Sequence, residues 1–106
     1  MHPALRLLRA IPKGKVATYA ELARVCAISP RAIGRIMARN KKPDRYPCYK
    51  VVSSSGALTG YSAPGGIAKK RALLRQDGVS FIRGRVDPKC FFTFAPRGRG
   101  MKRFIS

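Results

Sequence analysis

The chain has 106 residues, of which 23 are Lys or Arg and only four are Asp or Glu, so its formal net charge is +19. This excess predicts binding to a polyanion such as nucleic acid, because each neutralised phosphate releases counterions and adds affinity. No apolar run approaches the roughly 18 residues that span a bilayer. We therefore expect a single compact domain over residues 1–106 of a non-membrane, intracellular protein, in the nucleoid-containing cytoplasm or the nucleus.

The first elements are short. Apolar residues recur at helical spacing from Ala4 to Ile11, and Pro12 and Gly14 end that helix. A short strand is predicted over residues 16–18. His2, the only histidine, precedes the helix and is a poor candidate for a metal ligand, so we expect neither a metal site nor a cofactor.

Thr18 and Glu21 have the spacing of a capping box, in which each side chain accepts a hydrogen bond from the other's backbone amide. The helix that follows is expected to bury Leu22, Val25 and Cys26. The three cysteines of the chain are widely spaced and none lies in a C-x-x-C pair, which argues against a disulfide framework or a zinc site.

A second helix begins at Ser29 and Pro30, an N-cap followed by proline at the first helical position, and runs to about residue 40. The tight turn over residues 27–29 makes the pair a helix-turn-helix. The residues of the second helix separate into three groups. The core group is Ile33, Ile36 and Met37, the basic row is Arg31, Arg35 and Arg39, and the small residues are Ala32, Gly34 and Ala38. The basic row suits a DNA groove, and the alternative is a solvated basic face.

Farther along, a polar connection over residues 41–45 leads to Pro47, Cys48 and a strand at Val51 and Val52. Turn residues then precede a glycine-rich loop over 58–66, a helix over 67–76 closed by Gly78, and a strand over 80–86. The aromatic half of the tail, with Phe91, Phe92, Phe94 and Phe104, is expected to complete the core. Residues 96–106 are expected to form a flexible basic arm.

From Gly14 to Gly78 the sequence resembles the C-terminal domain of the O6-alkylguanine-DNA alkyltransferases and the alkyltransferase-like proteins. The resemblance rests on Arg31, Asn40 and the Pro47-Cys48 pair, on Tyr61-Ser62 and on Asp77 in the place of a glutamate. It implies a mainly α fold with a small β component, organised as one helix-turn-helix, winged-helix-like DNA-binding domain.

The resemblance also implies roles for individual residues. Arg31 would fill the gap left by a flipped base, Asn40 would order the turn, and Cys48 would accept the alkyl group, with Tyr49 and Asp77 in the proton relay. The expected DNA contacts are Arg31, Ala32, Gly34, Arg35, Arg39, Tyr19 and Lys50. The expected base pocket consists of Tyr19, Met37, Pro47, Val51, Tyr61 and Ser62. The expected partner is double-stranded DNA containing alkylated guanine, bound by a monomer.

The chemistry fits these residue types. A base inside the duplex must be rotated out before its O6 substituent can be reached. The acceptor must then be a thiolate, the common side chain nucleophilic enough for displacement at an alkyl carbon. In the family a histidine follows the cysteine and relays its proton, whereas this chain has Tyr49, and Lys50 replaces an arginine. We expect slow transfer, since a phenol is a poor base at pH 7.

Two other functions stay open at this stage. The short chain resembles alkyltransferase-like sensors, which transfer nothing and mark the lesion for nucleotide excision repair proteins. A plain helix-turn-helix nucleoid or regulatory protein would explain the charge and the arginine row. That function leaves Pro47-Cys48 and Tyr61-Ser62 without a purpose.

Overall fold

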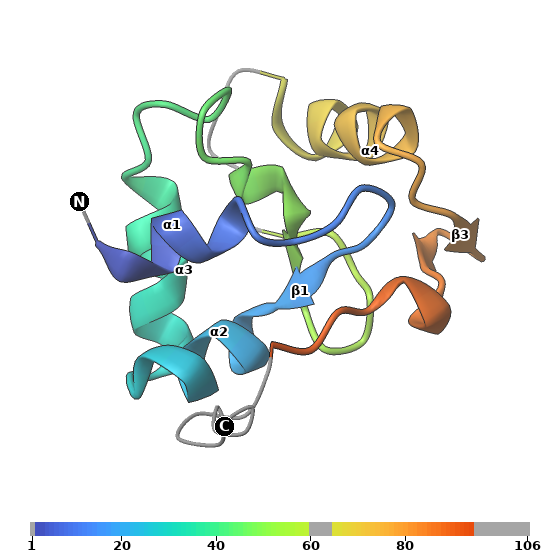
Figure 1. Cartoon of the computed structure of the whole chain (residues 1–106). Helices are drawn as coiled ribbons and strands as arrows, with labels where there is room; N and C mark the ends of the chain where they lie inside the picture. The colour runs from blue at the N-terminus through green and yellow to red at the C-terminus, as the bar shows by residue number, and fades with distance from the viewer. Residues whose placement is uncertain (1, 60–64, 95–106) are drawn as a thin grey trace.

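The computed structural model describes residues 2–59 and 65–94 (Figure 1). In chain order the elements are α1 (Pro3–Leu8), β1 (Ala17–Thr18), α2 (Tyr19–Cys26), α3 (Pro30–Ala38), the 3-10 helix η1 (Cys48–Lys50), β2 (Val51–Val52), α4 (Gly66–Gln76), β3 (Phe81–Ile82), β4 (Arg85–Val86) and the 3-10 helix η2 (Pro88–Cys90). The predicted class, mainly α with a small β component, is confirmed. None of these helices is long and apolar enough to cross a bilayer.

The predicted helix-turn-helix is formed by α2 and α3, which pack against each other. Ala27 ends α2 in the left-handed region with φ 59°. The hydroxyl of Ser29 then accepts a 3.1 Å hydrogen bond from the amide of Ala32, so the predicted N-cap of α3 is confirmed. Ile33 and Met37 are buried against the rest of the core, as the helical spacing predicts.

Two short parallel strands separate two apolar clusters. Ala17 of β1 lies opposite Val51 of β2, and both belong to the cluster formed by α1, α2, α3 and η1. Val52 belongs to the second cluster, with α4 and the C-terminal hairpin. Successive residues of a strand point to opposite faces, so Val51 and Val52 pack into different clusters. Figure 1 shows β1 between α1–α3 on one side and α4 with β3 on the other.

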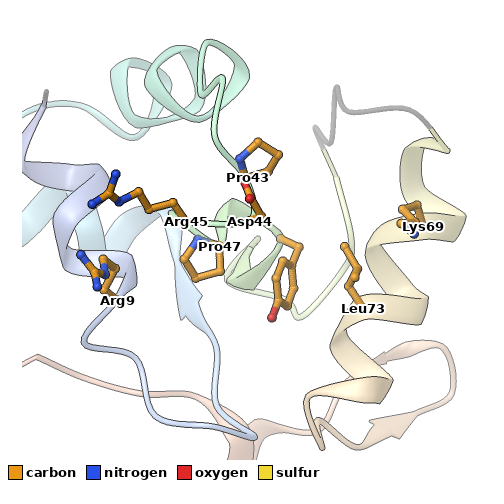
Figure 2. A pocket seen from close by; sticks show the side chains of 8 residues that line it. Arg9, Pro43, Asp44, Arg45, Pro47, Lys69 and Leu73 are labelled. Carbon is orange, nitrogen blue, oxygen red and sulfur yellow. The ribbon is translucent and has the colours of Figure 1, made fainter.

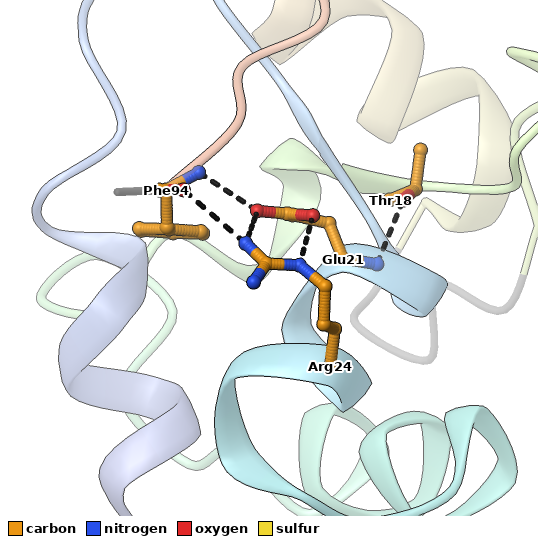
Figure 3. A network of polar contacts seen from close by, with 4 residues as sticks. All are labelled: Thr18, Glu21, Arg24 and Phe94. Carbon is orange, nitrogen blue, oxygen red and sulfur yellow. Dashed lines mark hydrogen bonds and ion pairs between the residues drawn. The ribbon is translucent and has the colours of Figure 1, made fainter. Parts of the chain in front are cut away.

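Only half of the predicted capping box forms. The hydroxyl of Thr18 accepts a 2.9 Å hydrogen bond from the amide of Glu21, as predicted. The carboxylate of Glu21 instead accepts hydrogen bonds from the guanidinium of Arg24 and, at 2.7 Å, from the amide of Phe94 (Figure 3). The predicted hydrogen bond from the Thr18 amide to Glu21 is wrong. The amide of Phe94, which is remote in the sequence, donates to this carboxylate instead.

The single strand predicted over residues 80–86 is wrong. The segment is a two-stranded antiparallel hairpin, with Phe81 opposite Val86. Its turn residues Arg83 and Gly84 both have positive φ, 54° and 81°. This is the conformation of a type I′ turn, whose twist matches that of a tight hairpin.

The predicted role of the C-terminal aromatics in the core is confirmed for Phe91, Phe92 and Phe94. Phe94 is buried, and the rings of Phe92 and Phe94 meet edge to face with centroids 5.0 Å apart. Phe104 and the expected basic arm lie outside the described residues.

Candidate functional site

Cys48 lies at the start of η1, in a turn held by side-chain and backbone hydrogen bonds. Its amide donates to the carbonyl of Tyr46 at 2.7 Å, and the same carbonyl accepts a 2.7 Å hydrogen bond from the side chain of Asn40. The Asn40 side-chain oxygen accepts from the amide of Lys42 at 3.0 Å. Asn40 therefore connects the end of α3 to the turn that carries the thiol. The thiol-bearing residue itself is only 8% exposed.

Two titratable side chains, Tyr19 and Lys70, share one backbone acceptor. The hydroxyl of Tyr19 donates to the carbonyl of Thr59 at 3.2 Å, and the ammonium of Lys70 donates to the same carbonyl at 2.8 Å. The Lys70 nitrogen also lies 5.9 Å from the centre of the Tyr19 ring. Tyr19, Thr59 and Lys70 thus bring α2, the segment after β2 and α4 together.

Burial governs the ionisation of both side chains. It raises the pKa of Tyr19 above its ordinary value, and it lowers the pKa of Lys70 to about 8. A negative charge on Cys48 raises both pKa values, as expected for an anion near a phenol and an ammonium. The tyrosine was among the predicted site residues, whereas the lysine was missed. Its signal was the i, i+4 spacing of Lys70 with the buried Leu74, which puts it on the buried face of α4.

Lys50 and Asp77 form an ion pair that the sequence did not predict. Lys50 is 3% exposed, and its ammonium lies 2.9 Å from the carboxylate of Asp77 and 2.8 Å from the carbonyl of Pro12. The same carboxylate accepts a 2.8 Å hydrogen bond from the amide of Gly14. The predicted DNA contact by Lys50 is therefore wrong, because its charge is used inside the protein. Asp77, expected in the proton relay, anchors this ion pair.

Tyr49 lines a surface cavity of about 590 Å³ beside the cysteine turn (Figure 2). Arg45 and Pro47 lie on one side of this cavity, and Lys69 and Leu73 of α4 lie on the other. The two residues that flank Cys48 in sequence therefore line this cavity. It contains none of the other residues predicted for the base pocket, so the place of Pro47 in that pocket stays a prediction.

The arginine row of α3 faces solvent. Arg31, Arg35 and Arg39 are all exposed. The helix starts with Arg31 at its second position, so this side chain projects from the end nearest the turn. Ala32 and Gly34 are partly exposed, and a Cβ built on Gly34 would meet no atom within 4 Å. Between its long basic side chains α3 therefore carries small residues, which leave room for close approach to its backbone.

Met37 and Val51, two residues predicted for the base pocket, lie in the same apolar cluster as Cys48. Val51 has no exposed surface, and its place in the base pocket stays a prediction. Tyr61 and Ser62 lie outside the described residues. In the described part of the chain no group of three His, Cys, Asp or Glu side chains gathers as metal ligands would.

An exposed arginine row on the second helix of a helix-turn-helix, beside a cysteine held in a hydrogen-bonded turn, defines the class of a basic helix-turn-helix domain with a thiol site. Comparison with known proteins identifies the family. The DNA-binding domain of 6-O-methylguanine DNA methyltransferase matches residues 2–79, so the chain belongs to this family.

Among curated relatives, the methylated-DNA--protein-cysteine methyltransferase of Pyrobaculum aerophilum is 45% identical over 75 residues, which cover 71% of this chain and 49% of the relative. A bifunctional methyltransferase/endonuclease of Picrophilus torridus is 44% identical over 85 residues, 78% of this chain and 28% of the relative. The chain therefore spans half or less of the length of these relatives.

Two solved structures are also similar. The O6-methylguanine-DNA methyltransferase of Pyrococcus kodakaraensis is 38% identical with a TM-score of 0.66, over 73% of this chain and 44% of that one. S. pombe Atl1, solved with damaged DNA containing O6-carboxymethylguanine, has a TM-score of 0.72 over 86% of this chain and 92% of that one. At 23% identity this second likeness shows the fold.

Proposed function

We propose that this protein binds duplex DNA containing an O6-alkylated guanine, rotates the modified nucleotide out of the stack and accepts the alkyl group on Cys48. The observation that carries the proposal is the position of Cys48. It lies in a turn fixed by Asn40, and it packs in one apolar cluster with residues of α3, against which Tyr19 also packs.

The α3 surface supports the DNA-binding part. Rotating a nucleotide out costs a few kcal/mol in unstacking and unpairing. Arg31, exposed at the start of α3, has the length and the flat guanidinium to occupy the vacated space and contact the orphaned base. The formal charge of +19 supplies sequence-independent affinity for the backbone.

In the transfer step the Cys48 sulfur attacks the alkyl carbon, a sulfur–carbon bond forms and the carbon–O6 bond breaks. The electron pair stays on the leaving guanine. The product is a thioether, and the described site holds no group that removes one, so each molecule acts once.

Tyr49 and the Lys50–Asp77 ion pair favour a second candidate function. With a phenol in the place of the histidine and the carboxylate bonded to Lys50, the family's proton relay lacks its usual members. A protein that binds O6-alkylguanine without transfer, and hands the lesion to nucleotide excision repair proteins, would need no proton relay. The fold of S. pombe Atl1, solved with damaged DNA, is consistent with this alternative.

Intact-protein mass spectrometry distinguishes the two. The protein and its Cys48→Ser variant are each incubated with a duplex that carries one O6-methylguanine. Transfer predicts a mass gain of one methyl group in the native protein and none in the variant. Lesion-selective binding without any mass gain would replace transfer by the sensor function. Equal affinity for damaged and undamaged duplex would contradict both.

A further inference from the structure

Two neighbouring cavities lie beside the cysteine turn. The larger is the cavity of about 590 Å³ in Figure 2, and the smaller, of about 470 Å³, is lined by Tyr46 and by residues at the end of α1. Arg9 lines both cavities, so they adjoin each other. Neither is lined by a residue of α2 or α3 or by any residue expected to contact DNA. The two cavities are therefore separate from the helix-turn-helix surface.

The lining of these cavities is strongly basic. It contains four exposed cations, Arg6, Arg9, Arg45 and Lys69, and one carboxylate, Asp44. None of the four cations takes part in an ion pair among the residues that the structure describes. Figure 2 shows Arg9 and Arg45 on one side of the larger cavity and Lys69 on the other. Such an excess of positive charge in a concave surface attracts an anion.

Rings and apolar side chains lie between these charges. Tyr46 lines the smaller cavity, and Tyr49 lines the larger one with Pro43, Pro47 and Leu73. Tyr46 packs against the apolar cluster of α1, α2 and α3, and Tyr49 packs against the cluster that includes α4. The core therefore holds both rings in place. Proteins bind single-stranded nucleic acid with this combination, because cations hold the phosphates while aromatic rings stack on the bases.

We propose that the two cavities bind an unpaired stretch of nucleic acid, with its phosphates on Arg6, Arg9 and Arg45 and one base against each tyrosine. Each volume lies in the range of small-ligand sites, roughly 300 to 1,000 Å³, and suits about one nucleotide. The bases of a duplex are stacked and paired, so they do not enter such cavities. The site requires neither Cys48 nor a lesion, so it goes beyond the proposed alkyl transfer.

An acidic peptide would also satisfy the cations. The two tyrosines favour nucleic acid, since an aromatic ring stacks on the flat face of any base and each cavity provides one ring. The charge comes from side chains on three segments, α1 with its C-cap, the connection before η1, and α4. A strand that crosses from one cavity to the next would contact all three.

The first test compares two ligands by fluorescence anisotropy, a short fluorescein-labelled oligothymidylate and an undamaged fluorescein-labelled duplex. The cavity variant is Arg9→Gln with Arg45→Gln, and both side chains are exposed, so the fold should persist. The control, Arg83→Gln with Arg85→Gln on the β3–β4 hairpin, removes the same charge from residues that line neither cavity.

We expect the cavity variant to lose about tenfold in affinity for oligothymidylate and less than about twofold for duplex. The slope of log affinity against log salt for oligothymidylate should become shallower by about 1.4, since each single-strand phosphate contact contributes about 0.7. The control should lose less than about twofold for either ligand. Equal losses of oligothymidylate binding in the two variants would overturn the proposal, because net charge alone would then explain the affinity.

A second measurement leaves the protein unchanged. An oligothymidylate that carries 5-iododeoxyuridine is irradiated in complex with the native protein, and the cross-linked peptide is identified by mass spectrometry. We expect attachment at Tyr46 or Tyr49, the rings that line the cavities. Attachment confined to α3 would overturn the site. Displacement of the oligothymidylate by polyglutamate at equal charge concentration would overturn its preference for nucleotides.

These results are independent of the methyl-transfer experiment. A methyl gain without oligothymidylate binding at the cavities means that transfer stands and the second site fails. Binding at the cavities without a methyl gain means that the second site stands on its own.

Discussion

The ammonium of Lys50 lies 2.9 Å from the carboxylate of Asp77, which also accepts a 2.8 Å hydrogen bond from the amide of Gly14. Lys50 ends η1, Asp77 caps α4, and Gly14 lies in the loop before β1. One ion pair therefore joins three segments around the cysteine turn. In this chain the carboxylate that the family resemblance assigns to proton relay has a structural partner.

Replacing Lys50 should therefore destabilise the fold. Lys50→Met leaves a largely buried carboxylate without its cation, and we expect the free energy of unfolding to fall by about 2 kcal/mol in urea denaturation. The matched control is Lys89→Met, which removes an exposed lysine from its 3.7 Å pair with Asp87 and should change stability by less than about 0.5 kcal/mol. Equal effects of the two substitutions would show that the buried pair is not an anchor.

Asp77→Asn should affect stability more than chemistry. We expect lower stability, by about 1 kcal/mol, because the amide is a weaker acceptor for Lys50 and Gly14. We also expect a single-turnover methyl-transfer rate within about threefold of the native protein at temperatures where both are folded. A loss of about tenfold or more in the folded variant would restore Asp77 to the relay.

Asn40→Ala removes both side-chain hydrogen bonds that order the cysteine turn. We expect a loss of about 1 to 2 kcal/mol in stability and slower methyl transfer at saturating DNA, with DNA affinity unchanged. Mass spectrometry of quenched single-turnover reactions measures the rate. Lys41→Ala, an exposed neighbour, is the control. Unaltered transfer in Asn40→Ala would mean that the turn is ordered by its backbone alone.

Lys70 should make stability depend on pH in the alkaline range. Its pKa is about 8 in the folded protein and 10.5 ordinarily, so between these values the unfolded chain binds a proton that the folded protein does not. Stability relative to Lys70→Met should therefore rise from pH 8 towards pH 10.5, by up to about 3 kcal/mol. Denaturant unfolding at pH 7.5 and pH 10 measures the change. A constant difference between the two proteins would show that the lysine titrates normally.

Glu21 should contribute stability that is lost in acid. Its hydrogen bonds from Arg24, and then from the Phe94 amide, hold the pKa of its carboxyl below the ordinary value despite partial burial. This contribution is present above about pH 4.5 and disappears as the pH falls through the folded pKa. Relative to Glu21→Gln, we expect an advantage of about 1 kcal/mol at pH 6 that closes by pH 3 in urea denaturation. An advantage that persists at pH 3 would contradict this.

Local patterns predicted the fold well where neighbours in sequence are also neighbours in space. Thr18 and Ser29 cap α2 and α3 through amides three residues away, and the helical spacing of Ile33 and Met37 predicts their burial. The hairpin was missed because a positive φ at Arg83 is rare for a residue with a side chain, and the sequence around it reads as one strand.

The sequence by itself determined the basic charge, the helix-turn-helix and the Pro47-Cys48 turn, because these depend on composition and on contacts within a few residues. The tertiary structure alone decided the partners of the buried charges. Lys50 and Lys70 are both buried lysines in a strongly basic chain, yet Lys50 is neutralised by Asp77, whereas Lys70 pairs with no Asp or Glu in the part of the chain that the structure describes. Burial and the distance between groups remote in sequence set such pairings, and neither is encoded in local spacing.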